Sequence, residues 1–285
     1  MSTRVQDGSP AGAAASPVTA ESYALLQEYI HRESGIILEG DKHYLVEARL
    51  MPVARKAGLT SINDLCALLR ATGGDPLKRE VVEAMTTNET HFFRDLAQYE
   101  ALRTVILPGL LEHRRQVRRL SFWSAAASSG QEAYSLAMML REMGLAGWDL
   151  RILGTDLAES VLQRARTGKY LQIEVNRGLP ATSLVRYFTR QGLEWQLKDE
   201  IRQMVRFERF DLRQSMRAFG PFDLIFCRNV LIYFDVETKK KILSNLYETL
   251  FSGGYLFLGV AETVFNLEER FERKAVGQTV VYQVH

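Results

Sequence analysis

The spacing of apolar residues changes after residue 85, and the change predicts two kinds of architecture. Before it, apolar positions recur every three or four residues, as Tyr23, Leu26 and Ile30 do on one helix face. Further helical runs are predicted at residues 42–56 and 62–69, and a fourth begins near Pro76, which suits a first helical position. We therefore expect a small all-α unit.

Beyond residue 119, short apolar runs alternate with helical runs. The runs of strand length lie at residues 120–123, 149–156, 222–227, 255–260 and 279–284. The continuous run at 222–227 is typical of a central parallel strand. Gly253 and Gly254 are expected to form the turn before 255–260. This alternation predicts an α/β fold with a doubly wound sheet.

These patterns divide the chain into three predicted parts: a disordered tail at 1–18, a small helical domain at 19–85 and a sheet domain at 86–285. The tail is rich in Ala, Gly, Ser and Pro and has no periodicity. An interruption of the alternation at about 170–210 predicts an inserted β hairpin or subdomain.

The inserted hairpin is predicted from three consecutive patterns. Apolar and polar residues alternate at 193–197, a charged turn follows at 198–200, and a strand returns at 205–208. Asp211 and Leu212 are then expected to follow a strand that resumes the main sheet.

Seven small residues, 124–130, separate the first apolar strand from a helical run that carries Ala133, Leu136 and Leu140 on one face. A small-residue loop between a strand and a helix N-terminus lets a flat ligand lie against the backbone. The loop lacks the GxGxxG spacing of dinucleotide enzymes, so it does not predict a pyrophosphate site. Packing in a tight turn explains the same residues, and both interpretations stay open.

The segment TTNETHFFRD, residues 86–95, mixes polar and aromatic residues. It is too polar for a core segment and too aromatic for a free linker. One interpretation is the capped start of a helix that leads to Leu111. The other is a segment that lies over a ligand, with Arg94 available to a carboxylate.

Asp156 ends the predicted strand 149–156 and lies about 25 residues beyond the small-residue loop, where nucleotide-binding α/β domains place a ribose-binding acid. A carboxylate can accept hydrogen bonds from both hydroxyls of the ribose diol. Asp156 can equally cap a helix predicted over 157–166, which Gly168 ends.

Composition and charge narrow the choice of function. A net charge of +2 does not favour global nucleic-acid binding, and no apolar stretch approaches the ~20 residues of a membrane-spanning helix. No signal-peptide core is present, so we expect a cytoplasmic protein without membrane insertion. Cys66 and Cys227 have no metal-binding or redox spacing, and no metal is expected.

Five motifs follow the helical unit in one order: TTNETHFFRD, FWSAAASSGQEAYS, GTD, FDLIFCRNVLIYFD and GGYLFLGVAE. Together they resemble the chemotaxis receptor methyltransferases, the CheR family, over about residues 20–285. The resemblance implies a class I methyltransferase-like sheet with an inserted β subdomain. It also implies a protein-glutamate O-methyltransferase of chemotaxis adaptation. Such an enzyme moves a methyl group from S-adenosylmethionine to glutamate side chains in chemoreceptor cytoplasmic helices, which leaves S-adenosylhomocysteine.

The resemblance also implies which residues surround the cofactor: Asn88, Thr90, Arg94, Glu132, Asp156, Asp211, Leu212, Asn229 and Val230. Asn88, Thr90 and Arg94 would reach the methionine portion or the transfer site, and Asp156 would bind the ribose hydroxyls. Arg94 and Tyr233 would be catalytic and would orient the acceptor carboxylate.

Two features of the sequence bear on the receptor. The hairpin between residues 190 and 205 is short, whereas tethered family members dock a receptor's C-terminal peptide on this subdomain as an added strand. We therefore predict a tether-independent enzyme. Arg49, Arg55 and Lys56 are candidates for docking acidic receptor helices, although such charges also suit a solvated helix face.

Three alternatives remain: a non-catalytic regulator that binds S-adenosylmethionine, a nicotinamide-dependent oxidoreductase, and a methyltransferase for nucleic acids or small molecules. Arg94 and Tyr233 disfavour the first. The missing GxGxxG disfavours the second. The third would not be expected to combine the TTNETHFFR segment with a β insertion.

Overall fold

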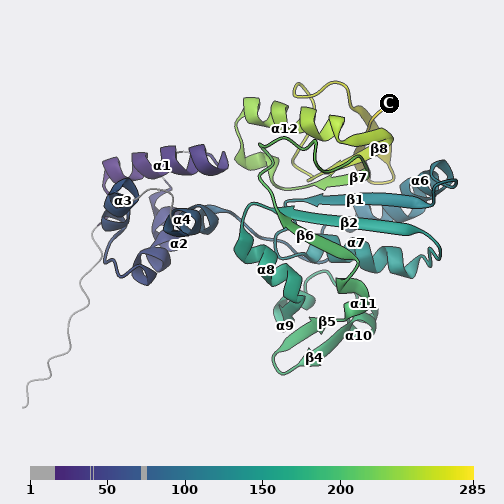
Figure 1. Cartoon of the computed structure of the whole chain (residues 1–285), viewed down its shortest axis with the longest axis horizontal. Coiled ribbons are helices and arrows are strands. Elements are labelled where there is room, and N and C mark those ends of the chain that lie inside the picture. Colours follow the sequence, from purple (N-terminus) through teal and green to yellow (C-terminus); the bar gives the residue numbers. More distant parts are fainter. Residues whose placement is uncertain (1–16, 39, 41, 72–75) are drawn as a thin grey trace, which may run out of the picture. The chain divides into compact units, whose positions relative to one another are not determined.

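The structure is a computed structural model that describes residues 17–38, 40, 42–71 and 76–285 (Figure 1). The chain divides into two compact units. The first ends at Met85 and the second consists of Ser34–Ile37 and Thr86–His285. Residues 1–16 of the predicted tail lie outside the described residues.

The helical unit forms because its apolar residues recur at helical spacing. Its helices are α1 (Ala20–Ser34), α2 (His43–Lys56), α3 (Ile62–Ala71) and α4 (Pro76–Met85). Leu26, Leu50 and Leu65 are fully buried, and each comes from a different helix. The helices predicted at 42–56, at 62–69 and from Pro76 are confirmed.

The second unit is built on a seven-stranded sheet with the order β6-β2-β1-β7-β8-β10-β9. The strands are β1 (Arg119–Ala125), β2 (Asp149–Asp156), β6 (Val205–Arg209), β7 (Phe222–Cys227), β8 (Leu250–Leu258), β9 (Glu272–Val276) and β10 (Thr279–Gln283). The run from β6 to β8 is parallel, whereas β10 and β9 join it antiparallel. The predicted α/β fold is therefore confirmed as a mixed sheet.

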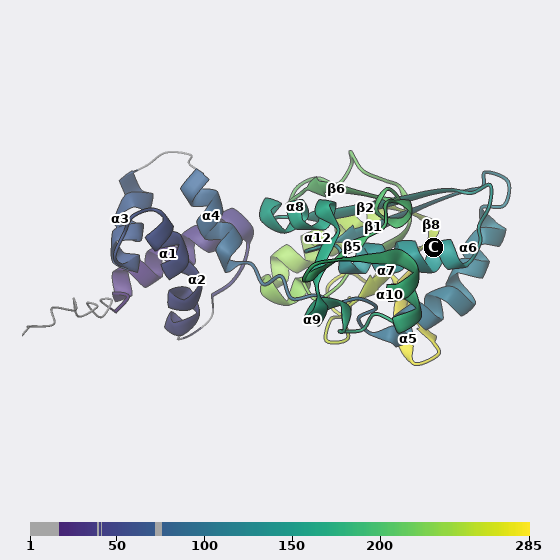
Figure 2. The same cartoon turned by 90° about the horizontal axis from the view of Figure 1, so that it is seen from below.

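Helices cover both faces of this sheet. α7 (Gln131–Glu142) and α8 (Glu159–Thr167) lie on one face and α12 (Val236–Glu248) on the other (Figure 1), and Figure 2 views the face of α7. Successive residues of β1 point to opposite faces, so Phe122 joins one hydrophobic core and Trp123 the other. The chain enters β1 through α5 (Leu96–Ala101), a π-helical turn (Leu102–Ile106) and α6 (Leu107–His113).

A second sheet forms the inserted subdomain, and it corrects the predicted hairpin. Its order is β3-β5-β4, with β3 (Lys169–Leu171), β4 (Phe188–Gln191) and β5 (Glu194–Leu197). The short helices beside it are α9 (Gln172–Val175), α10 (Ala181–Tyr187) and α11 (Asp199–Arg202).

The strand predicted at 205–208 does not belong to the hairpin. It is β6, and Val205 pairs with Ile152 of β2 in the main sheet. β5 pairs instead with β4 through a turn in which Gly192 has a φ of 62°. α11 then separates β5 from β6, so the two cannot form a hairpin.

The turn predicted at Gly253 and Gly254 is also wrong, because both residues lie inside β8. Pairing between β7 and β8 shifts register between Phe222 and Leu224, and a β-carbon on Gly254 would lie 2.8 Å from the Phe251 carbonyl oxygen. Close backbone approach at a strand irregularity explains the glycine there.

Candidate active site

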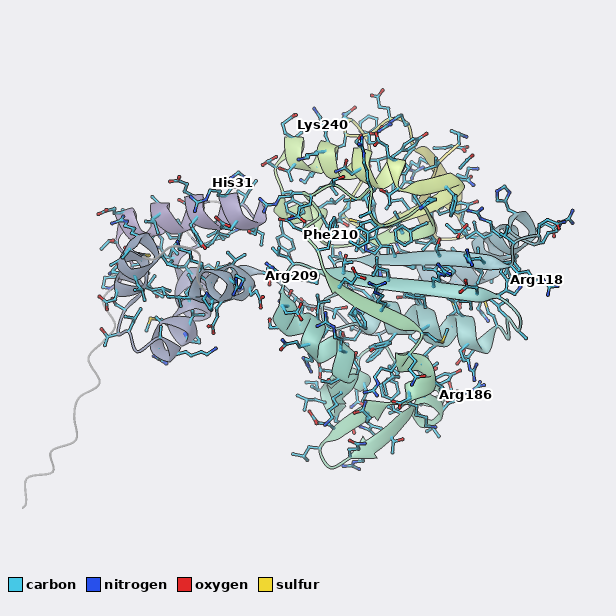
Figure 3. The ribbon with its side chains drawn as sticks, viewed as in Figure 1. His31, Arg118, Arg186, Arg209, Phe210 and Lys240 are labelled. Carbon is cyan, nitrogen blue, oxygen red and sulfur yellow. The ribbon has the colours of Figure 1, made fainter. Side chains whose placement is uncertain are left out.

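Loops at the carboxyl edge of the parallel strands enclose a cavity in the second unit. Its lining comes from the residues after β1, β2, β6 and β7, from residues 34–36 and from residues 86–94. Phe210, which Figure 3 labels beside Arg209 at the end of β6, is part of it. Ligands of open α/β sheets bind at this edge.

The cavity brings together all residues that the resemblance implies for the site: Asn88, Thr90, Arg94, Glu132, Asp156, Asp211, Leu212, Asn229, Val230 and Tyr233. They come from segments that are far apart in the sequence. Their individual roles stay predictions.

The small-residue loop after β1 is tied to the end of β2. The backbone N–H groups of Ala126 and Ala127 both donate to the Thr155 carbonyl, at 2.9 and 2.8 Å. Ala126 and Ser128 have φ values of 76° and 50°, which residues other than glycine seldom adopt and bulky or β-branched residues least of all. The loop therefore presents backbone and small side chains to the cavity.

Asp156 is held by two backbone donors and still faces the cavity. Ser128 N–H donates to Asp156 Oδ2 at 2.9 Å, and Ala158 N–H donates to Oδ1 at 3.0 Å. α8 begins at Glu159 with Ala158 at its N-cap position, so Asp156 is not the helix cap that one interpretation predicted. A carboxylate offers about four lone-pair sites in all, so this type of group can accept hydrogen bonds from a diol.

Arg228 is a buried cation in the cavity wall. Arg228 follows β7, and its Nη1 donates to Glu132 Oε2 at 2.9 Å. Ser124 Oγ donates to the other Glu132 oxygen at 2.6 Å. Burial alone would lower the pKa of Arg228, but Glu132 above all, with Tyr99 and Asp95, raises that pKa above its ordinary value. Arg228 is therefore charged.

The loop after Arg228 is held by Glu262. Its Oε2 accepts the Asn229 N–H at 2.7 Å, and its Oε1 accepts those of Val230 and Leu231 at 2.9 and 2.8 Å. Asn229 has a φ of 57°, a conformation that Asn tolerates better than most residues. The Glu262 carboxylate therefore holds the backbone of Asn229 and Val230, which line the cavity.

Asp211 forms an ion pair with Arg213, two residues further along the chain. Arg213 Nη2 lies 2.6 Å from Asp211 Oδ2, and the Arg213 N–H donates to Oδ1. This closes the turn after β6 and places Leu212 against the cavity. Gly35 lies close by, where a β-carbon would be 2.8 Å from Arg213 Cδ.

The segment 86–95 lines the cavity, and no side chain caps the helix after it. α5 begins at Leu96, and Asp95 at its N-cap position makes no capping hydrogen bond. Asn88 is attached to the β1 loop, since Ser128 Oγ donates to its carbonyl at 2.8 Å. Arg94 Nη1 donates to the Glu89 carbonyl at 3.2 Å.

Tyr233 lies in a short 3₁₀ helix (Leu231–Tyr233), and its carbonyl accepts the Ile37 N–H at 3.0 Å.

Two charged residues at this site were given no role from the sequence: Arg228, which lines the cavity, and Glu262, which binds the loop after it. Arg228 immediately follows a fully buried strand, and a charge in that position was a usable signal because it lies at the ligand-binding edge. Glu262 ends the GGYLFLGVAE motif, but nothing local indicates that it accepts the backbone N–H groups of residues 229–231.

The chemistry of the wall suits a nucleoside joined to an amino acid. Phe210, Leu212 and Val230 offer apolar surface for a base. Asp156 suits a ribose diol, and Arg94 and Glu132 suit the charged groups of an amino acid. Among the described residues, no group of three His, Cys, Asp or Glu is arranged to hold a metal ion.

Comparison with known proteins decides the family. Residues 88–280 match the model described as CheR methyltransferase, SAM binding domain, and residues 21–86 match CheR methyltransferase, all-alpha domain. The chain belongs to the CheR methyltransferase family. It is an enzyme that uses S-adenosylmethionine, and the wall described above fits that cofactor.

Relatives with curated names span nearly the whole chain. "Chemotaxis protein methyltransferase Cher2" of Pseudomonas putida is 38% identical over 90% of this chain and 94% of its own length. "Chemotaxis protein methyltransferase 1" of Pseudomonas aeruginosa is 39% identical over 92% and 97%. Among solved structures, TrmN from Thermus thermophilus is 18% identical over 61% of this chain and 46% of that chain, with a TM-score of 0.35, too loose a likeness to add to the argument.

Membership of this family removes the oxidoreductase and the non-catalytic regulator from the alternatives. In the part of the chain that the structure describes, we find no helix with the length and apolar character needed to cross a membrane.

The basic residues of the helical unit are largely engaged within that unit. Arg49 Nη1 donates to the Met85 carbonyl at 2.8 Å and so joins α2 to the end of α4. Lys56 Nζ lies 2.8 Å from Glu80 Oε1, and both Lys56 and Arg55 are exposed.

Proposed function

We propose that this enzyme methylates glutamate side chains in the cytoplasmic helices of chemoreceptors and forms glutamyl methyl esters. One observation carries the proposal: Arg94 and Tyr233 line the same cavity as Asp156 and the rest of the cofactor set. A guanidinium and a phenol suit a carboxylate acceptor better than a base or an amine. The names of the Pseudomonas relatives support a role in chemotaxis.

The chemistry needs no general base. A solvent-exposed glutamate has a pKa near 4.3, so the acceptor oxygen is already ionised at neutral pH. S-adenosylmethionine supplies a sulfonium methyl group, which passes to a carboxylate oxygen while the carbon–sulfur bond electrons stay on sulfur in S-adenosylhomocysteine. The protein has to supply alignment and removal of water from the carboxylate.

We assign alignment to Arg94 and Tyr233. Both must bind the acceptor weakly, because stronger binding of the ground state than of the transition state slows the reaction. Asp156 binds the ribose hydroxyls in this proposal, and Asn88, Thr90 and Glu132 hold the methionine end. The pairs Asp211-Leu212 and Asn229-Val230 surround the adenosine.

We further propose that the helical unit docks the receptor through exposed basic side chains of α2. Arg55 is the best candidate, since Arg49 and Lys56 already have partners within the unit. Exposed charges are screened within ~8 Å at physiological salt, so docking should weaken as salt rises. An unchanged KM for receptor between low and high salt would argue against it.

We also propose that transfer does not need a receptor tether. The support is the two-residue turn between β4 and β5, which leaves the subdomain small. A tail peptide would have to pair with an outer strand of this sheet, β3 or β4, each of which pairs only with β5 among the described strands. Comparing transfer to receptors with and without a C-terminal tail therefore distinguishes tether-dependent from tether-independent methylation.

The test is transfer of radiolabelled methyl groups from S-adenosylmethionine to receptor cytoplasmic fragments, with and without their C-terminal tails. We expect base-labile label on both, lost when the acceptor glutamates are replaced by alanine. Label on tailed fragments alone would overturn tether independence but keep the enzyme. Base-stable label would overturn the glutamyl ester.

The proposed role of Arg94 has its own test. Arg94→Ala should lower kcat by about 100-fold, while the Kd for S-adenosylmethionine changes far less. Transfer by Arg94→Ala at the wild-type rate would exclude the role.

A further inference from the structure

Arg94 lies between two residues with unfavourable backbone conformations. Phe93 has a φ of 48° and Asp95 a φ of 61°, and neither is glycine. Such residues store strain and persist only where their surroundings hold them. Because the strain flanks a residue proposed for catalysis, the groups that hold this segment determine where the Arg94 side chain can reach.

The segment is anchored on its N-terminal side by the core. Phe92 is fully buried, with its ring 5.0 Å from that of Tyr170. Gly178 lies so close that a β-carbon on it would be 2.0 Å from the Phe92 carbonyl oxygen. The Phe93 N–H donates to Ser135 Oγ of α7 at 2.9 Å.

On the C-terminal side the segment is held by one side chain. Arg228 Nη2 donates to the Arg94 carbonyl at 2.8 Å and also to Asp95 Oδ2. The same guanidinium binds Glu132 through Nη1, and its side chain is only 1% exposed. Asp95 is therefore drawn to Arg228 instead of capping α5.

We infer that Arg228 is a positioning residue that holds the strained main chain on both sides of Arg94 and joins it to Glu132. It acts through Arg94 and need not touch the acceptor. This inference rests on the proposed role of Arg94 in transfer. Without Arg228, Phe93 and Asp95 can relax to negative φ, and the Arg94 guanidinium no longer has a fixed position.

Lysine is the informative replacement. Its single ammonium keeps the positive charge but cannot present the planar fork that reaches the Arg94 carbonyl, Asp95 and Glu132 together. We expect Arg228→Lys to lower kcat by about tenfold, with a much smaller change in the Kd for S-adenosylmethionine. Asp95→Asn removes the ion pair at similar size and should act in the same direction.

A double-mutant cycle separates positioning from a general structural role. Arg228→Lys is measured in the wild type and in Arg94→Ala, with kcat and KM for receptor fragments, cofactor Kd and denaturant unfolding as readouts. If Arg228 acts through Arg94, the tenfold loss should shrink to less than about twofold in the Arg94→Ala background. A second cycle combines Asp95→Asn with Arg94→Ala. It tests whether the Arg228–Asp95 pair acts through Arg94 if Arg228→Lys does not fold.

The matched control is Asp223→Asn, which breaks the Arg114–Asp223 pair at the other end of β7. It should not couple to Arg94 in either background. Equal fold-losses from Arg228→Lys with and without Arg94 would overturn the inference alone. A wild-type rate in Arg94→Ala would overturn the proposed role of Arg94 and this inference with it.

Discussion

Two arginines pair with acidic side chains at opposite ends of β7, and the two sets of ion pairs have different surroundings. Arg114, just after α6, pairs with Asp223 near the start of the strand at 2.6 Å. Arg228 follows the end of the strand and pairs with Glu132 and Asp95. Each has one nitrogen with no partner among the described residues, Arg114 Nη2 and Arg228 Nε.

The surroundings of the two pairs differ. Arg114 lies over the Phe251 ring at 3.6 Å, and Asp223 also accepts the Ser121 N–H at 2.8 Å. That pair joins a helix end to two strands at the edge away from the cavity. Arg228 instead joins a strand end, a helix start and a strained loop within the cavity wall. The same chemistry stabilises the fold at one end and organises the site at the other.

The largest effect should come from Arg228→Met. It leaves Glu132 and Asp95 without their cation, and removing one partner of a buried pair costs about 3–5 kcal/mol. We expect a fall of this size in the free energy of unfolding and no measurable methyl transfer. Urea unfolding and the radiolabel assay check both. Full methyl-transfer activity in folded Arg228→Met would show that Arg228, like Arg114, supports only the stability of the fold.

Asp223→Asn should cost about 2 kcal/mol, because an amide still accepts the Ser121 N–H and Arg114 keeps partial access to water. Its kcat and cofactor Kd should equal those of the wild type. Urea unfolding and methyl-transfer kinetics on the same preparation test this. A clear loss of kcat would mean that this pair also supports the site.

Asp156→Asn should weaken binding of S-adenosylmethionine by about tenfold, since one hydroxyl of the diol loses a charged acceptor. The kcat at saturating cofactor should change little. Calorimetric titration measures the Kd. An unchanged affinity for S-adenosylmethionine would mean that Asp156 does not bind the ribose and only accepts the N–H groups of Ser128 and Ala158.

The smallest effect concerns Cys227, which lies between the two pairs at the end of β7. Burial raises its pKa well above the ordinary 9.0, and Glu262 and Glu132 raise that pKa further. The folded chain therefore holds this proton more tightly than the unfolded chain. The stability it contributes is complete below pH 9.0 and is lost as the pH rises beyond, by about 1 kcal/mol over the first unit.

Cys227→Ala should remove this part of the pH dependence, because alanine does not titrate. Denaturant unfolding between pH 8 and pH 10 compares the two slopes. Parallel slopes for the variant and the wild type would contradict the assignment.

Much of the sheet and the position of the site could be predicted, because both depend on residues that are close in sequence. The apolar runs 149–156 and 222–227 coincide with β2 and β7. The ends of those strands placed Asp156 and Asn229 at the ligand-binding edge. The resemblance supplied the other predicted site residues, which periodicity alone would not have indicated.

Pairing between strands was harder to predict. β5 pairs with β4 and not with β6, since a turn at Gly192 and the helix α11 decide which strands meet. Gly253 and Gly254 suggested a turn, but register at a bulge keeps them within β8. β9 was not predicted, because its residues are only partly buried and carry a weak pattern.

The sequence by itself determined the helices, most strands and the small side chains of the β1 loop, because these follow from local spacing and size. Tertiary structure decided that Arg228 meets Glu132 and Asp95, which lie 96 and 133 residues away along the chain. It also decided the positive φ values on both sides of Arg94. Local preference opposes that conformation, and only contacts between distant residues can hold it.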